Sequence, residues 1–250
     1  MAVSVVSSAE RPCGTESRLP KHRELVHSEV ACFKFIIKVV RHLLSLIMDD
    51  FSPLLDYFAP HITFSKEDKE LFISVLGVKK VKRKQFLEQP GYVSKHRNFV
   101  VEGALWAYII GTNGQEHTIS LALHNGWIGD HGSFVLQEPG TLFVEALEDS
   151  TLIQWSYESE QLLLRRIPSF ALLMMERSQR VAVTIQNRVI SNLTLSAEGR
   201  YEEFVAKYPE YFQRIPLYII ASYLGMTREF LSRIRNQKLS PKNIAQNTVN

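Results

Sequence analysis

The stretch from residue 77 to residue 157 constrains the fold most, because a glycine interrupts it about every dozen residues. Between the glycines lie short runs rich in Val, Ile, Phe, Tyr and Trp. This spacing predicts short strands joined by turns, as in a β sandwich or barrel built of hairpins. The clearest hairpin is expected at residues 98–123, where NFVVEGALWAYII and QEHTISLAL flank Asn113-Gly114. That dipeptide supplies the positive φ angles of a tight turn.

Helical patterns lie on both sides of this segment. Residues 49–76 carry apolar residues at helical spacing, and Ser65, followed closely by acidic residues, predicts a helix start. Residues 158–195 return to helical spacing. Within them, Pro168 predicts a short helix before it and a long main helix after it, near residues 169–193.

The long predicted helix carries one apolar stripe. Its members recur at steps of three and four residues: Ile167, Ala171, Met174, Ser178, Val181, Ile185 and Val189. A helix of this kind either covers its own β domain or pairs with its copy in a second subunit. Periodicity alone favours neither alternative.

The charge and cysteine content exclude several classes of protein. With 29 Lys plus Arg against 26 Asp plus Glu, the net charge of +3 does not mark the whole molecule as a nucleic-acid binder. Any such role must rest on a local basic cluster. The two cysteines, Cys13 and Cys32, provide neither a disulfide framework nor a cysteine metal cluster. This favours a reducing, cytoplasmic location.

Residues 1–47 are interpreted as a leader outside the folded part, either disordered or added by a mis-called start codon. Met48 opens a stretch that is typical of a domain start. The apolar run at residues 30–47 contains three basic residues, each of which is costly inside a membrane. We therefore expect no transmembrane helix and no membrane partner.

The C-terminal region joins an apolar helix to a basic one. Residues 215–225, IPLYIIASYLG, are almost free of charge, and residues 226–240, MTREFLSRIRNQKLS, follow directly. Gly225 permits a tight turn, and Thr227 is expected to cap the second helix through its side-chain oxygen. The expected buried residues are Ile220, Ala221, Leu224, Phe230, Leu231 and Ile234. Between residues 215 and 242, five basic residues and one acid give a local net charge of +4. An ordinary helical hairpin with a solvated basic face is the alternative.

This order of elements resembles the Crp/Fnr family of bacterial transcription regulators, from residue 49 to about residue 240. The stretch IASYLGMTREFLSRI is similar to the recognition unit of the family, and Thr227, Arg228, Glu229 and Arg233 match it residue by residue. The resemblance implies a homodimer that binds double-stranded DNA, with RNA polymerase as a candidate further partner. It implies DNA contacts from Thr227, Arg228, Glu229, Ser232, Arg233, Arg235 and Lys238.

The glycine-punctuated segment resembles the cyclic-nucleotide-binding β roll of this family. Gly129-Asp130 matches the entry to its phosphate cassette, but Gly140 stands where cyclic-nucleotide binders carry an arginine. A buried phosphodiester needs such a guanidinium to offset its desolvation. We therefore expect an unknown small-molecule effector, not cyclic AMP bound in the usual way, and we assign no cofactor. The resemblance places the effector against Gly129, Asp130, Thr141, Ile185 and Gln186.

Other features separate this chain from its relatives in the family. Iron–sulfur sensing is not expected, because no cysteine cluster precedes the β segment. After the recognition helix the family usually adds a two-stranded wing, whereas this chain ends in the polar segment LSPKNIAQNTVN. We expect a DNA-binding unit that lacks a clear wing and loses affinity steeply as the salt concentration rises.

Two other interpretations stay open. His117, His124 and His131, with Glu116 or Asp130, suggest the metal site of a cupin-like enzyme. Strand alternation, however, does not place histidines with this spacing on one face. No phosphate loop, nucleophile elbow or HExxH pattern occurs, so we do not expect an enzyme. The second alternative is a ligand-binding or interaction module whose DNA-binding unit has degenerated.

These features together predict an α+β protein. Residues 48–160 are expected to form a β-roll effector domain, a double-stranded β-helix with a helical preface. Residues 161–195 form the long dimerisation helix. Residues 196–250 form a small all-α helix-turn-helix domain, which begins with a connecting helix near residues 197–207. In this hypothesis the effector changes the pose of the paired long helices, and the pose sets whether the recognition helices lie about 34 Å apart.

Overall fold

The structure, a computed structural model, describes residues 51–238 of the chain. The described strands are β1 (Gly77–Val81), β2 (Phe86–Glu88), β3 (His96–Glu102), β4 (Leu105–Ile110), β5 (Glu116–Ala122), β6 (Trp127–Ile128), β7 (Phe143–Ala146) and β8 (Ser150–Ser156). The described helices are α2 (Lys66–Ser74), α3 (His131–Leu136), α4 (Tyr157–Arg166), α5 (Pro168–Thr194), α6 (Ala197–Lys207), α7 (Tyr211–Arg214), α8 (Leu217–Tyr223) and α9 (Arg228–Lys238). Residues 51–58 are helical as well. The predictions for the leader and for the missing wing lie outside the described residues.

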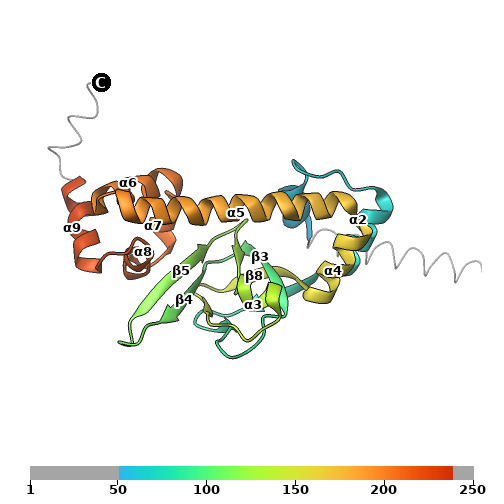
Figure 1. The fold of residues 1–250 in the computed structure, drawn as a ribbon, viewed down its shortest axis with the longest axis horizontal. Helices are drawn as coiled ribbons and strands as arrows, with labels where there is room; N and C mark the ends of the chain where they lie inside the picture. The colour runs from blue at the N-terminus through green and yellow to red at the C-terminus, as the bar shows by residue number, and fades with distance from the viewer. Residues whose placement is uncertain (1–50, 239–250) are drawn as a thin grey trace, which may run out of the picture. The chain divides into compact units, whose positions relative to one another are not determined.

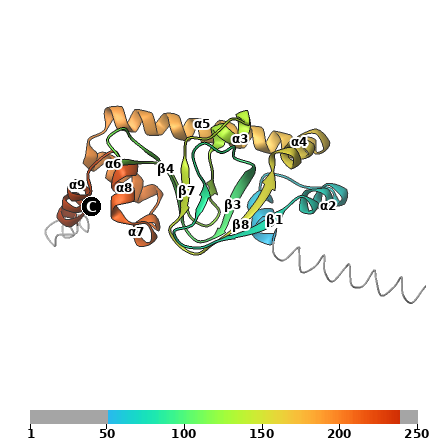
Figure 2. The same ribbon diagram turned by 90° about the horizontal axis from the view of Figure 1, so that it is seen from below.

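The strands form two four-stranded antiparallel sheets, with the orders β1-β8-β3-β6 and β2-β7-β4-β5. Figure 2 shows β1, β8 and β3 side by side in the first sheet. Side chains from both sheets fill the space between them: Val81, Val100, Leu105, Ala107, Ala122, Ile128, Val144, Ala146 and Leu152. This architecture is the predicted β roll, and the helices around it confirm the α+β class.

One predicted strand is in fact two. The sequence predicts one strand over residues 98–110, but the structure breaks this segment at Gly103, where φ is +103°. A Cβ at this position would lie 2.6 Å from the Ser150 Cβ, so the chain can turn only at a glycine. As a result β3 and β4 belong to different sheets. The turn at Asn113-Gly114 also differs from the prediction of positive φ angles at both residues. Gly114 has a positive φ of 78°, but Asn113 does not. The Asn113 side chain instead accepts a hydrogen bond from the Gln115 amide.

The long helix α5 has two different environments along its length (Figure 1). At its start, Ile167, Phe170 and Met174 are buried with the helical preface against the first sheet. Further along, Val181 and Ile185 are exposed. The predicted apolar stripe therefore divides: its first part packs on the β roll, and its second part has no cover among the described residues.

The C-terminal helices share a hydrophobic cluster with the second sheet. Trp106 and Tyr108 of β4 are buried against Phe204 and Ile219. Because β5 lies at the edge of its sheet, its outer backbone groups need other partners. Ser222 provides two of them, since its Oγ accepts from the Thr118 amide at 2.9 Å and donates to the Glu116 carbonyl at 3.0 Å. Arg188 of α5 donates to the Thr118 and Ile119 carbonyls.

Candidate functional site

The helix–turn–helix at residues 217–238 has the predicted local structure. Ile220 and Ala221 of α8 are buried, and Gly225 has the left-handed φ of 68° that the turn requires. The Thr227 Oγ1 accepts a hydrogen bond from the Phe230 amide at 3.2 Å, which is the predicted cap. The Met226 amide also donates to the Ala221 carbonyl at 3.0 Å, so hydrogen bonds at both ends of the turn fix the direction in which α9 leaves α8.

Helix α9 has a buried face and a charged face. Leu231 and Ile234 are 0% and 2% exposed, and Leu224 of the preceding helix is buried beside them; Phe230 is half-buried. Most of the predicted DNA contacts are exposed: Thr227, Arg228, Glu229, Arg233 and Arg235. Ser232 is half-buried. The side chain of Lys238 lies outside the described part of the chain. This face can therefore present guanidinium groups to an anionic partner.

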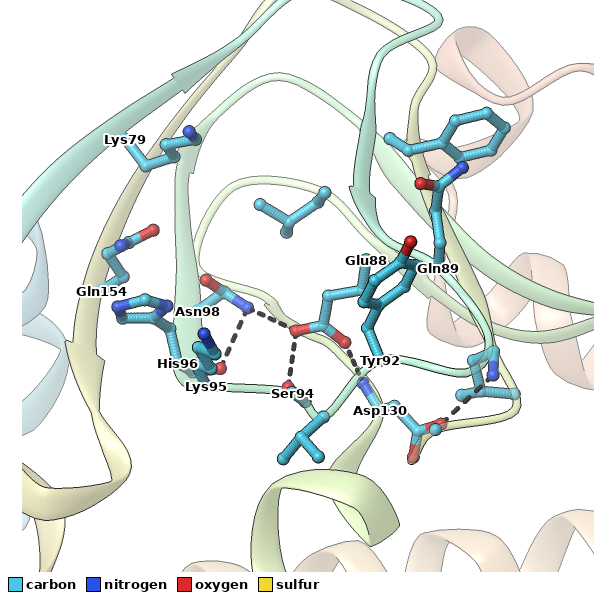
Figure 3. A pocket seen from close by; sticks show the side chains of 15 residues that line it. Lys79, Glu88, Gln89, Tyr92, Ser94, Lys95, His96, Asn98, Asp130 and Gln154 are labelled. Carbon is cyan, nitrogen blue, oxygen red and sulfur yellow. Dashed lines mark hydrogen bonds between the residues drawn. The ribbon is translucent and has the colours of Figure 1, made fainter. Parts of the chain in front are cut away.

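A second candidate site is a cavity of about 390 Å³ at one end of the β roll (Figure 3). Its wall is formed by β1, β2, β3 and β8, by the loop between β2 and β3, and by the segment around Asp130. Polar residues dominate it: Lys79, Glu88, Tyr92, His96, Asn98 and Gln154. Partial burial lowers the pKa of His96, which favours its neutral form.

Asp130 serves the fold at this cavity. One carboxylate oxygen accepts from the Ser133 amide at 3.0 Å and caps α3. The other accepts from the amides of Thr141 and Leu142, at 2.9 Å and 3.2 Å. The Asp130 carboxylate therefore occupies the amide donors at which a ligand anion could bind.

Among the cavity residues that the sequence reasoning missed are Glu88 and Asn98. Glu88 Oε1 accepts from Ser94 Oγ at 2.8 Å and from Asn98 Nδ2 at 3.2 Å, and Glu88 Oε2 accepts from the Asp130 amide at 2.7 Å. Burial raises the pKa of Glu88. Asn98 is 2% exposed, and its Oδ1 has no hydrogen-bond partner among the described residues. The sequence offered one signal for Asn98: it is a polar residue at a strand position that alternation assigns to the interior.

The remaining predicted effector residues do not line this cavity within the described part of the chain. A Cβ at Gly129 would lie 3.2 Å from Glu88 Oε1, so Gly129 adjoins the cavity wall. Thr141 contributes its backbone amide to Asp130, and its side chain is exposed. Ile185 and Gln186 are exposed on α5. Their role in effector binding stays a prediction, as do the assigned DNA contacts.

Gly140, at the position where the family resemblance predicts the arginine of a cyclic-nucleotide binder, lies against Asp130. A Cβ at Gly140 would lie 2.8 Å from Asp130 Oδ2 and 3.2 Å from the Ser133 Cβ. Even the smallest side chain therefore displaces the Asp130 carboxylate, and the position has no room for a guanidinium group.

A buried ion pair connects the region around α3 to α4. Arg97 donates to both carboxylate oxygens of Glu160, at 2.6 Å each, and their side chains are 11% and 7% exposed. Trp155 Nε1 donates to the same carboxylate at 2.9 Å, and Arg97 Nη1 lies 3.1 Å from His131 Nδ1. On α5, burial lowers the pKa of Arg177 to about 10.

The histidines of the alternative metal site lie apart. His124 Nδ1 lies 3.7 Å from Glu210, His131 contacts Arg97, and His117 is exposed on β5. Among residues 51–238 no group of three or more His, Cys, Asp or Glu side chains could hold a metal ion. Over the same range, no helix has both the length and the apolar character needed to span a bilayer.

The comparisons with known proteins bear on the fold. Neither a protein-family model nor a curated protein sequence matches the chain. Solved structures do match. FixK2 from Bradyrhizobium japonicum is 16% identical with a TM-score of 0.58, over 66% of this chain and 84% of its own. The global regulator CLP of Xanthomonas campestris is 16% identical with a TM-score of 0.55, over 70% and 91%.

This chain has the Crp/Fnr fold. A mutant of CooA from Carboxydothermus hydrogenoformans matches as well, at 18% identity and a TM-score of 0.52, over 71% of this chain and 80% of its own. The resemblance that the recognition unit predicted is thus confirmed at the level of the fold. Identities this low carry the Crp/Fnr architecture but not the effector or the DNA sequence that is read.

Proposed function

We propose that the protein is a homodimeric transcription regulator that binds double-stranded DNA through α9. The observation that carries this proposal is the exposure of Arg228, Arg233 and Arg235 on a helix held in place by the buried Leu231 and Ile234. Guanidinium groups in this arrangement suit guanine edges and phosphates in the major groove. The proposal places the protein in the cytoplasm, with RNA polymerase as a further partner.

The exposed part of α5 supports the dimer. Apolar side chains that water would otherwise surround follow this helix: Leu172, Met175, Val181, Val183, Ile185, Val189, Ile190 and Leu193. An apolar face of this length on one helix fits the same face of a second copy, which would complete a two-stranded coil. Pairing of the copies would place two recognition helices on one side of the DNA, about 34 Å apart.

Substitutions on α5 test the dimer. Leu193 is 80% exposed, so Leu193→Glu should leave the fold of the subunit intact and place a charge in the proposed seam. We expect monomers in analytical ultracentrifugation and a loss of DNA binding. Leu162→Glu on α4 is the matched control and should remain dimeric. A Leu193→Glu protein that still sediments as a dimer would reject this seam.

Substitutions on α9 test DNA binding. A DNA selection with the wild-type protein would supply an operator, on which Arg228→Ala and Arg233→Ala should each cost about 1–3 kcal/mol of binding free energy. Arg166→Ala, an exposed arginine on α4, makes the same change in net charge and should leave binding nearly unchanged. Equal effects of all three variants would favour the alternative, a module with a degenerate DNA-binding unit.

An effector in the roll cavity could reach α5 through residues already described. Asn98 and His96 line the cavity, and Arg97 between them holds Glu160 of α4, which leads directly into α5. A ligand would shift DNA binding only if it bound two poses of this connection with different affinity. Titration of DNA affinity against the effector measures that difference.

A further inference from the structure

The inner wall of the roll cavity offers hydrogen-bond acceptors. Asn98 donates through Nδ2 to Glu88 Oε1 and to the His96 carbonyl, both at 3.2 Å, while its Oδ1 has no partner among the described residues. Buried amide oxygens are normally paired. The Asn98 side chain is 2% exposed and lines the cavity, so a bound ligand that carries an O–H or N–H group can supply the missing donor after a small rotation of the amide.

The same wall is unsuited to a phosphate. Glu88 and Asp130 bring two carboxylates to this end of the cavity. The amides of Asp130, Ser133, Thr141 and Leu142 already donate to those carboxylates. A phosphate at this end would therefore face negative charge without free backbone donors.

The rest of the lining is rich in planar polar groups and aromatic rings. Gln89 and Gln154 each offer a donor and an acceptor, and the exposed rings of Tyr92 and Phe86 also line the cavity. Planar amides and carboxylates can pair with hydroxyls on adjacent carbons, and an aromatic ring can cover the C–H face between them. The volume of about 390 Å³ lies in the range of small-molecule sites.

We propose that the roll cavity binds a neutral polyhydroxylated ligand the size of one or two sugar rings, with Asn98 and Glu88 accepting its hydroxyl protons and Gln154 contacting it from β8. The proposal deepens the proposed effector role of the cavity and rests on it only for the consequence for DNA. Lys79 and Lys95 are exposed at the mouth, where they would tolerate a carboxylate at the outer end of such a ligand.

Thermal-shift and calorimetric titrations test the proposal with defined probes. The neutral arm contains glucose, galactose, arabinose, xylose, maltose and myo-inositol at high millimolar concentration. The anionic arms contain glucuronate, glucose 6-phosphate and cyclic AMP. We expect at least one neutral probe to stabilise and bind the protein, glucuronate to bind only where its neutral parent does, and neither phosphate-bearing probe to bind. The proposal would be overturned if only the phosphate-bearing probes bind, or if none of the neutral probes binds.

Variants locate the binding. Asn98→Leu keeps the side-chain volume and removes the acceptor, so it should weaken the best neutral probe at least about tenfold. If Asn98→Leu does not fold, Gln154→Leu provides the same test, because Gln154 of β8 lies directly beside Asn98 in the same sheet. Lys80→Ala, an exposed lysine of β1 outside the cavity lining, should leave the affinity for a neutral probe unchanged. Unchanged affinity in a folded Asn98→Leu or Gln154→Leu protein would contradict the proposed site.

Failure of this proposal can be told apart from failure of the proposed function. Arg228→Ala should weaken DNA binding and keep the affinity for the sugar probe, because α9 does not line the cavity. If the protein binds DNA but none of the neutral probes, only the proposed ligand class is rejected. If it binds a sugar probe but no DNA, only the regulator role is rejected.

Discussion

Replacing Arg97 with methionine is expected to destabilise the fold by about 3–5 kcal/mol, because it leaves a buried charge unpaired. The Glu160 side chain is 7% exposed, and two of its three hydrogen bonds come from Arg97. In Arg97→Met, the Trp155 indole is the one donor of these three that remains for the carboxylate. The guanidinium also lies 4.5 Å from the centre of the Phe134 ring, a contact worth roughly 0.5–1 kcal/mol more.

The double variant separates a lost pair from a lost side chain. Glu160→Met leaves Arg97 as the unpaired buried charge, so it should cost nearly as much as Arg97→Met. Combining both substitutions removes both charges and leaves apolar groups of similar volume. The combination should therefore cost much less than the sum of the single effects, within about 2 kcal/mol of the wild-type stability.

Urea unfolding followed by tryptophan fluorescence would measure all four proteins, provided that the transitions are two-state. The fraction of dimer must be held constant, since subunit association adds to the apparent stability. A cost below about 1 kcal/mol for Arg97→Met would refute the reasoning. Additive single effects would do so as well, since they would mean that the two charges are independently solvated.

Three further perturbations test local features of the structure. Gly140→Ala should lower the stability by about 1–3 kcal/mol, because its Cβ would displace the Asp130 carboxylate from the cap of α3. Thermal melting measures this loss, and an unchanged melting temperature would show that the loop can move to accommodate the Cβ. Ser222→Ala should cost a similar 1–3 kcal/mol by leaving the buried Thr118 amide unpaired, and hydrogen exchange at Thr118 should accelerate; unchanged protection would mean another acceptor takes over. Partial burial, and then the cations of Arg97 and Arg177, lower the pKa of His131 from 6.5, so the unfolded chain binds its proton first and stability falls as the pH drops below about 6.5. His131→Gln should reduce that fall in urea midpoints, whereas His117→Gln should not; equal slopes would contradict the assignment.

The helix–turn–helix could be predicted because its determinants are close together in the sequence. Gly225, Thr227 and the apolar positions Leu231 and Ile234 lie within ten residues of one another, and each acts on its own or the next turn. Local rules of capping and periodicity are sufficient for such a unit. The same rules located the long helix after Pro168.

The cavity could not be predicted in the same way, because its partners come from distant parts of the chain. The oxygens of Asp130 bond to amides up to twelve residues away, and Glu88 lies 42 residues before the Asp130 amide that it accepts from. The break at Gly103 likewise depends on Ser150 in another strand. Sequence periodicity finds such positions without showing what they face.

The covering of β5 by α8 has a consequence for dividing the chain. A fragment that stops before residue 196 would leave the Thr118 amide without its hydrogen-bond partner. It would also expose Trp106 and Tyr108, which are 2% and 4% exposed in the whole protein. An unpaired edge strand of this kind can pair with a strand of a neighbouring molecule. The β roll is therefore expected to self-associate or precipitate when it is made alone, and joining it to a different C-terminal domain would require a replacement for this cover.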